Sequence, residues 1–282
     1  LEATARAIID VAVSGMYREI TKLLSRNGVD PRTLTLLAFG GAGPMIAAQL
    51  ARELGMPRIV VPTTPGVLSA FGGLIADAKN DFIQTVYLDL EEAALPQLRA
   101  RMADLERQAI AWLRDEQRHD GEPMLLYSAD MRYRGQSFEI ECPLDRSWWA
   151  EGADAALAVR QIGDAFHRTH QQTYDHADPK ALVQIINLRL VIVGRVPKPA
   201  LPELAPGQGD AMPVAEVMLT LDGAEASAKV FERPSLEAGQ RFQGPAIVLQ
   251  EDCTTCLPDG FVCTVDRYGN LLIDPSSQAD LP

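Results

Sequence analysis

The sequence lacks the long hydrophobic runs and the basic charge that would tie a protein to a membrane or to nucleic acid. None of its apolar runs approaches the ~20 residues needed to span a bilayer. Its net charge is −12, whereas nucleic-acid binding depends on Lys and Arg side chains that neutralise phosphates. We therefore expect neither a membrane nor nucleic acid as a partner.

Cysteine is also scarce, with four residues in 282 and no framework typical of a disulfide-stapled protein. Cys253 and Cys256 form a CxxC pair, and Cys263 follows nearby. Structural zinc usually takes four ligands from two such pairs, and the second pair is missing. We expect buried or half-buried thiols in a strand pair, no metal, and a reducing cytoplasmic setting.

Familiar catalytic motifs are missing as well. The sequence has no Gly-x-Ser-x-Gly elbow, no P-loop Gly-Lys-Ser/Thr and no complete Rossmann fingerprint. No Ser/His/Asp order stands out either. Nothing therefore indicates a nucleophilic hydrolase, and no catalytic residue is assigned.

What the sequence does contain is an α/β pattern from Leu34 to Asp81. An apolar run of strand length, Leu34–Phe39, leads into a glycine-rich turn and a helical pattern at Met45–Leu54, which Gly55 ends. A second strand follows at Arg58–Pro62, and then another helical pattern. Strand, turn, helix and strand in this order predict a parallel α/β layer.

The glycine-rich turn consists of Gly40, Gly41, Ala42, Gly43 and Pro44. Glycine permits positive φ and close approach of another group, and proline suits the first turn of a helix. Free N–H groups at a helix start favour an anion such as phosphate. Two interpretations stay open from the residues alone: an anion-binding turn, or a tight connection without a ligand.

Further elements follow from periodicity and turn residues. The segment 66–78 predicts a helix, although Gly72-Gly73 would require a break or a close neighbour. Asp77, Asn80 and Asp81 beyond it are expected to be solvated caps rather than metal ligands. Gly135-Gln136 predicts a hairpin. We expect helices at 3–27, 92–118 and 154–174, strands at 82–90, 124–134, 137–142 and 181–196, an extended connection at 197–213, and a small barrel or sandwich of strands at 214–221, 226–231, 246–250, 261–265 and 271–273.

Two side-chain groups are candidates for binding. His167 and His170 lie at i and i+3 of a predicted helix, where a third ligand from Asp164, Tyr174, Asp175 or His176 would complete a metal site. We favour a structural or interface role for them. Arg132, Arg134 and Gln136 suit either an anion or a partner, or else a salt-bridge ladder with Glu139 and Glu141.

Several motifs spread over nearly the whole chain resemble one family, the hydantoinase A/5-oxoprolinase family. It includes N-methylhydantoinase A subunits and acetone carboxylase β subunits. The motifs are Ala38–Pro44, Ala51–Gly55, Pro65–Gly72, Met131–Ser137, Asn187–Arg189 and Gly244–Ile247.

The resemblance implies a fold of the α/β and α+β classes. Residues 1–90 would be the C-terminal part of an actin-like (ASKHA, RNase H-like) ATPase domain. Residues 91–282 would be the family's C-terminal domain, mixed α/β to about residue 196 and β-rich over 213–275. The family's N-terminal half, with its phosphate loop, has no counterpart here, so we expect a C-terminal portion that is inactive alone.

The resemblance also implies ATP and Mg2+ as cofactors and a hydantoinase B-type subunit or domain as partner. ATP would phosphorylate a small cyclic-amide substrate, and Gly40–Pro44 would contact the nucleotide through the backbone. One alternative is the β subunit of an acetone or ketone carboxylase. Another is a non-catalytic assembly module that forms a homo-oligomer or binds the partner subunit.

Overall fold

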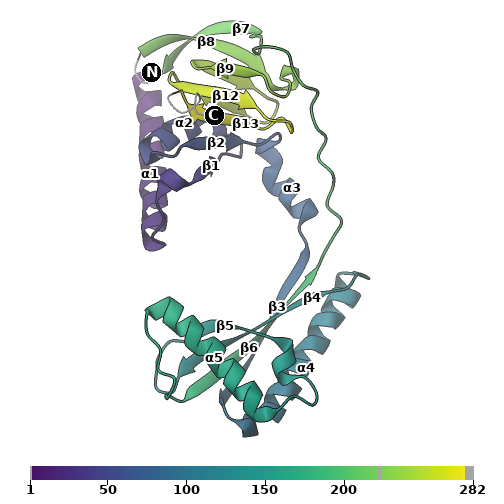
Figure 1. Ribbon diagram of the computed structural model, residues 1–282. Helices are drawn as coiled ribbons and strands as arrows, with labels where there is room; N and C mark the ends of the chain where they lie inside the picture. Colours follow the sequence, from purple (N-terminus) through teal and green to yellow (C-terminus); the bar gives the residue numbers. More distant parts are fainter. Residues whose placement is uncertain (1, 222–223, 277–282) are drawn as a thin grey trace. The chain divides into compact units, whose positions relative to one another are not determined.

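The computed structural model describes residues 2–221 and 224–276. The chain forms two compact units, each described separately below. The first unit combines residues 1–74 with residues 199–282, and the second comprises residues 75–198 (Figure 1). The first unit is therefore built from the two ends of the chain.

A five-stranded sheet in the first unit joins these two ends. Its strand order is β1-β2-β13-β12-β9, with β1 and β2 parallel and the other pairs antiparallel. Leu271 of β13 is the register partner of Val61 of β2, so residues about 210 positions apart in sequence pair directly. The strands are β1 (Thr35–Leu37), β2 (Arg58–Val61), β9 (Arg241–Gln243), β12 (Phe261–Val265) and β13 (Leu271–Pro275).

A second sheet of the first unit has the order β11-β10-β8-β7. It consists of β7 (Ala215–Leu221), β8 (Ala224–Glu232), β10 (Ala246–Leu249) and β11 (Thr254–Leu257). Most strands of the two sheets were expected. The exceptions are β9 in the first sheet and β11 in the second. The strands after residue 213 do not form the expected small barrel or sandwich by themselves, because β9, β12 and β13 complete the sheet of β1 and β2.

Three helices belong mainly to the first unit: α1 (Glu2–Arg26), α2 (Gly43–Leu54) and α3 (Leu68–Ile75). The predicted stripe on α1 is largely confirmed, since Val13 is buried and Met16, Ile20 and Leu24 pack against the core. Gly55 ends α2 with φ 68°, the left-handed conformation expected of a glycine C-cap. The helix α3 has no buried residue, and a Cβ on Gly72 or Gly73 would meet nothing within 4 Å in this chain.

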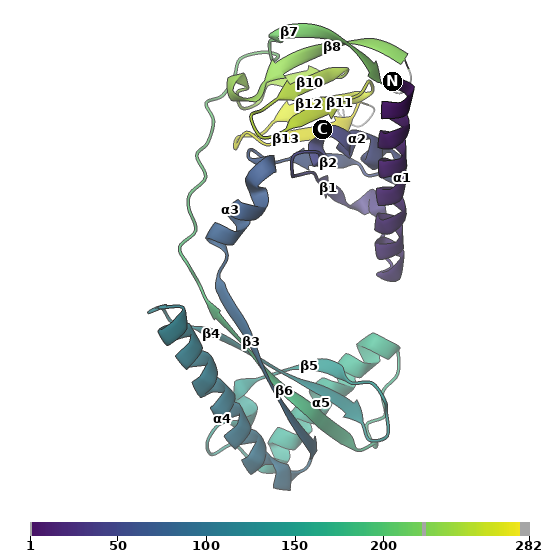
Figure 2. The same cartoon turned by 180° about the vertical axis from the view of Figure 1, so that it is seen from behind.

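The second unit contains one antiparallel sheet of order β3-β6-β4-β5. The predicted hairpin is confirmed as β4 and β5, and β3 and β6 run side by side in both views (Figure 1, Figure 2). Pairing of Ala78 with Gly194 starts β3 earlier than expected. The strands are β3 (Ala78–Asp89), β4 (Met124–Tyr133), β5 (Ile140–Leu144) and β6 (Val183–Gly194).

Two long helices, α4 (Leu95–Ala111) and α5 (Ala155–Tyr174), share one core with this sheet. The apolar stripe of α4 supplies Leu98, Met102 and Leu105, each at most 2% exposed, and its last turn widens into a π-helix at Trp112–Glu116. Asp154 caps α5 by accepting the Leu157 N–H at 2.7 Å. The predicted positions of both helices are confirmed.

The chain passes from one unit to the other between residues 74 and 75 and again between residues 198 and 199, not at residue 90. The physical reason is that β3 pairs along its length with β6, which draws residues 78–89 into the second unit. Residues 197–213 lack regular structure, as predicted, apart from one bridge between Pro206 and Ala238. In the described part of the chain, no helix has the length and apolar content to cross a membrane.

Candidate functional site

The glycine-rich turn follows the end of β1 and leads directly into α2. Ala38 is buried and donates its N–H to the Val60 carbonyl at 2.9 Å, which holds the end of β1 against β2. The backbone then leaves the core, since Phe39 is exposed. Pro44 occupies the first turn of α2 and is buried there. The predicted strand, turn and helix are confirmed.

Within the turn, the glycines have different roles. Only Gly40 adopts positive φ, at 82°, and its N–H donates to the Pro65 carbonyl at 2.7 Å. A Cβ on Gly41 would meet only the Asp252 carbonyl oxygen, at 3.8 Å, which is an ordinary contact. Gly40 is therefore required by the backbone conformation. Gly41 leaves open space above the turn.

Three successive N–H groups at the start of α2 are free to bind a ligand. In the residues that the structure covers, those of Gly41, Ala42 and Gly43 have no recorded acceptor. Gly41 and Ala42 are exposed. They lie at the positive end of the 12-residue helix α2. The turn can therefore bind an anion through its backbone, without proton transfer.

A second loop supports this turn and was not anticipated from the sequence. The Asp252 carboxylate accepts the Gly66 N–H at 2.8 Å, and the Gln250 side chain donates to the Thr63 carbonyl at 2.6 Å. Both acceptor and donor come from the connection between β10 and β11. No local pattern indicates such contacts, because about 190 residues separate the partners.

Arg233 is a further residue that the sequence did not single out. Its guanidinium is buried and donates to the carbonyls of Val61, Pro62 and Gly269, at 3.2, 3.1 and 2.6 Å. Burial lowers the pKa of the guanidinium from its ordinary value. Arg233 thus holds the end of β2 and the β12–β13 turn together.

A groove of about 470 Å³ lies beside the first turn of α2. Its size falls in the range of small-molecule sites. Its walls are mainly apolar and come from α1, α2 and the second sheet of the first unit. The lining residues are Ala5, Arg6, Ile9, Asp10, Met45, Ile46, Gln49, Met218, Leu219, Thr220, Ile247, Thr254 and Cys256.

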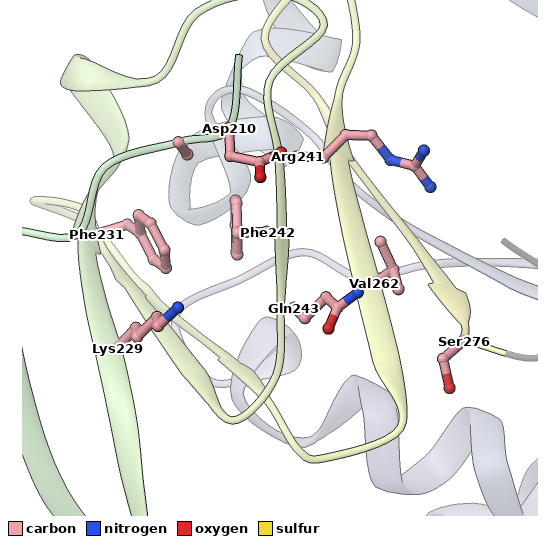
Figure 3. A pocket seen from close by; sticks show the side chains of 9 residues that line it. Asp210, Lys229, Phe231, Arg241, Phe242, Gln243, Val262 and Ser276 are labelled. Atoms are coloured by element: carbon pink, nitrogen blue, oxygen red, sulfur yellow. The ribbon is translucent and has the colours of Figure 1, made fainter.

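A different pocket, of about 480 Å³, contains no residue predicted to bind a ligand (Figure 3). Lys229 and Phe231 reach it from β8, and Arg241 and Gln243 reach it from β9. Because it shares no residue with the glycine-rich turn, we do not place the candidate site there.

The histidines of α5 form a hydrogen-bonded cluster rather than a metal site. His167 Nδ1 lies 2.8 Å from the Tyr133 hydroxyl, which also accepts the Asp178 N–H at 2.8 Å. His170 is buried, with Nδ1 2.5 Å from the His176 carbonyl oxygen and Nε2 3.3 Å from Gln136 Nε2. Over residues 2–221 and 224–276, no group of three or more potential metal-binding side chains occurs.

Of the two interpretations left open for Arg132 and Arg134, the salt-bridge ladder with Glu139 and Glu141 is wrong. Arg134 pairs with Asp89 at 3.2 Å, and Arg132 Nε lies 3.4 Å from the Gln184 side-chain oxygen. The β4–β5 pairing ends at Met131–Ile140, so later residues of β4 meet only β6. Glu141 instead accepts the Ser128 hydroxyl at 2.6 Å.

The remaining polar candidates have structural partners. Asp77 accepts from Lys198 Nζ at 2.7 Å and from the Val196 N–H at 3.0 Å, and these bonds lower the pKa of its carboxyl group. Cys256 is half-buried on β11 and pairs with Ile247 of β10, which confirms the prediction of a thiol in a strand pair, whereas Cys253 is buried just before β11. Burial raises the pKa of the Cys253 thiol.

Known proteins of similar sequence cover this chain almost completely. It is 28% identical to caprolactamase subunit alpha of Pseudomonas jessenii and 25% identical to the acetone carboxylase beta subunit of Xanthobacter autotrophicus. The first alignment covers 98% of this chain and 40% of the relative, and the second covers 95% and 39%. It is also 25% identical to 5-oxoprolinase 1 of Arabidopsis thaliana, over 97% of this chain and 21% of that relative.

Solved structures of two of these enzymes share the fold. A nucleotide-free acetone carboxylase structure matches with a TM-score of 0.82 at 23% identity. An ATP-dependent caprolactamase of Pseudomonas jessenii matches with a TM-score of 0.71 at 27% identity. Each match covers 97% of this chain and 40% of the other chain. The mixed α/β fold with several sheets is thus shared with both.

Family models agree with these similarities. Residues 1–82 match the hydantoinase/oxoprolinase model, and residues 88–273 match the hydantoinase/oxoprolinase C-terminal domain. The chain spans about two fifths of the caprolactamase and acetone carboxylase subunits that it matches. The chain belongs to the hydantoinase/oxoprolinase family.

Proposed function

We propose that this chain is part of an ATP-dependent cyclic-amide hydrolase of the hydantoinase/5-oxoprolinase type. The observation that carries the proposal is the turn at Gly40–Pro44. At this turn, the N–H groups of Gly41, Ala42 and Gly43 lie at the start of α2 without an acceptor in the described residues. Relatives described as an ATP-dependent caprolactamase and a 5-oxoprolinase support the cyclic-amide class.

In this proposal, Gly41, Ala42 and Gly43 donate backbone N–H groups to the nucleotide, and Gly40 and Pro44 hold the turn in shape. ATP, when bound, supplies a phosphoryl group that turns a substrate oxygen into a better leaving group. The mainly apolar groove beside Met45 and Ile46 lies next to the same helix start and offers space for an apolar part of a ligand. Magnesium belongs to the proposal for the whole protein, where it would neutralise charge on the nucleotide phosphates.

We assign residues 1–90 to the C-terminal part of an actin-like ATPase domain and residues 91–282 to the family's C-terminal domain. The two family models, which meet between residues 82 and 88, support this division. The strands β9, β12 and β13 pair in one sheet with β1 and β2. In this proposal, they therefore stabilise the sheet that carries the nucleotide-binding turn.

We further propose that catalysis needs polypeptide that this chain does not cover, and a hydantoinase B-type partner subunit or domain. The relatives are about two and a half times longer, and two of them are named as subunits. The chain alone should therefore show no ATPase activity. Turnover that Gly41→Val abolishes would contradict this statement.

A ketone carboxylase β subunit is the alternative within the same family, and the acetone carboxylase relative supports it. A second alternative, a subunit-assembly module, is favoured by large apolar side chains that this chain leaves exposed. Leu74 of α3 is 84% exposed and Phe138 is 80% exposed. A stable dimer in light scattering, unaffected by nucleotide, would favour assembly.

Calorimetric titration with Mg-ADP tests the nucleotide role. We expect binding to the native chain and its loss in Gly41→Val. The fold should tolerate this change, because Gly41 has no positive φ and no close neighbour. If a chain that melts cooperatively binds no Mg-ADP, the nucleotide role of the turn in this chain is wrong.

A further inference from the structure

We propose that Asp252 is the positioning residue of the glycine-rich turn, acting through the peptide group between Pro65 and Gly66. This inference rests on the proposed nucleotide role of the turn. Asp252 lies between β10 and β11, about 210 residues from Gly40, and its side-chain hydrogen bond goes to the loop that follows β2. Its effect is therefore transmitted through a second loop.

The contact between Asp252 and that loop is close. The Asp252 Oδ2 accepts the Gly66 N–H at 2.8 Å. A Cβ added to Gly66 would lie 2.6 Å from Oδ2, 2.7 Å from Cβ and 2.8 Å from Cγ of Asp252. Only a glycine at position 66 allows the carboxylate to approach this far.

The same peptide group reaches the glycine-rich turn on its other side. The Pro65 carbonyl accepts the Gly40 N–H at 2.7 Å. The Pro65 carbonyl and the Gly66 N–H belong to one planar unit and point in opposite directions in a trans peptide. Asp252 and Gly40 therefore hold the two ends of one rigid plane, and rotation of that plane would break both bonds.

The β10–β11 loop is itself held in place. Gln250 donates from its side chain to the Thr63 carbonyl at 2.6 Å, and its backbone N–H donates to the Cys253 carbonyl at 3.1 Å. The Asp252 carbonyl would lie 3.8 Å from a Cβ on Gly41. The Asp252 segment thus borders the turn by its backbone as well as supporting it through its side chain.

From these contacts, Asp252 fixes the orientation of the N–H groups of Gly41, Ala42 and Gly43. Gly40 is the residue with positive φ at which the backbone turns toward α2. If its N–H loses the Pro65 carbonyl, the segment that carries the following three donors loses the hydrogen bond that holds its start in place. Preorganised donors bind an anion with less ordering cost.

The test uses the 282-residue chain and three variants, Asp252→Ala, Asp252→Asn and Glu251→Ala. Amide hydrogen exchange at Gly66 and Gly40 is followed by NMR. We expect about tenfold faster exchange at both amides in Asp252→Ala. Asp252→Asn keeps an acceptor oxygen and should restore most of the protection. Glu251 is an exposed neighbouring acid, and its removal should change neither amide.

Mg-ADP affinity provides the second measurement. We expect about tenfold weaker binding in Asp252→Ala and partial recovery in Asp252→Asn. If Gly40 exchange is unchanged in Asp252→Ala, the inference is wrong. If the native chain binds no Mg-ADP but Gly40 exchange rises as expected, the nucleotide role fails while the coupling of Asp252 to the turn stands. If Asp252→Ala does not fold, native protection of Gly40 in Asp252→Asn supports the inference, and lost protection overturns it.

Discussion

Arg189 donates from Nε to the Asp130 carboxylate at 2.8 Å, and the Asp130 side chain is only 7% exposed. The other Asp130 oxygen accepts from the Asn187 amide at 2.8 Å. Asn187 and Arg189 belong to a motif that supported the family resemblance without a role. The structure gives them one, because together they neutralise and satisfy a buried carboxylate on β4.

Replacing Arg189 with Met should destabilise the second unit by about 3–5 kcal/mol, because it leaves the Asp130 charge buried without its cation. All three tryptophans, Trp112, Trp148 and Trp149, lie in this unit. Tryptophan fluorescence during urea unfolding therefore reports on the unit that contains the pair.

Arg134→Met is the matched control, since Arg134 is 57% exposed in its pair with Asp89. Its loss should cost less than about 1 kcal/mol. Equal effects of the two substitutions would show that burial of Asp130 does not determine the stability of the pair.

Substituting Ala for Gly244 should destabilise the first unit by at least about 3 kcal/mol. The added Cβ would collide with the Pro258 carbonyl oxygen and would lie 2.7 Å from the Pro258 carbonyl carbon, and neither backbone atom can move independently. Hydrogen exchange of the β12 amides, which lie in the same unit, measures the loss.

Gly73→Ala is the contrasting control. Gly73 lies inside α3, and a Cβ there meets nothing within 4 Å. Alanine should therefore stabilise the chain by roughly 0.5–1 kcal/mol through helix propensity.

Unchanged β12 protection in Gly244→Ala would contradict the first of these two predictions. It would mean that the strands separate easily at the contact between Gly244 and Pro258.

The stability of the α5 cluster should fall as the pH is lowered below about 6.5, the ordinary histidine value. Burial lowers the pKa of His167, and the nearby His170 lowers it further. The Asp164 and Asp178 carboxylates act in the opposite direction and raise it. The unfolded chain then binds a proton at a pH where the folded chain does not, so protonation favours unfolding. The stability contribution of His167 is complete above the pKa that this side chain has in the unfolded chain. It is lost as the pH falls through the lowered pKa that the side chain has in the folded chain.

Urea unfolding followed by tryptophan fluorescence between pH 5 and 8 measures this dependence. His167→Gln should flatten the curve. His176→Gln is the matched control, because the His176 side chain is exposed. The same slope in the His167 variant and the native chain would assign the pH dependence to other groups.

Local sequence patterns predicted the helices and most strands, whereas the starts of β3 at Ala78 and of β5 at Ile140 differ from the predicted positions 82 and 137. The Gly55 stop and the hairpin at Gly135 depend on neighbours within a few residues, which the sequence displays directly. The short strands β9 and β11 were missed, because three or four residues carry too little periodicity.

The candidate site was predicted only in part, for a related reason. The glycine-rich turn is a local feature and was identified from its residues. The side chains of Asp252 and Arg233 bond to segments about 170–190 residues away, so only the tertiary fold brings these partners together. The assembly of the first unit from both ends of the chain was missed as well, because the pairing of β13 with β2 joins residues about 210 positions apart.

NMR titration with Mg-ADP tests the central claim most directly, because each backbone amide reports its own contact. The claim predicts the largest shift changes at Gly41, Ala42 and Gly43, smaller ones at Met45 and Ile46, and none in Gly41→Val. Shifts confined to the pocket of Lys229 and Arg241, or an unchanged spectrum at saturating nucleotide, would contradict the assignment of the glycine-rich turn as the nucleotide contact.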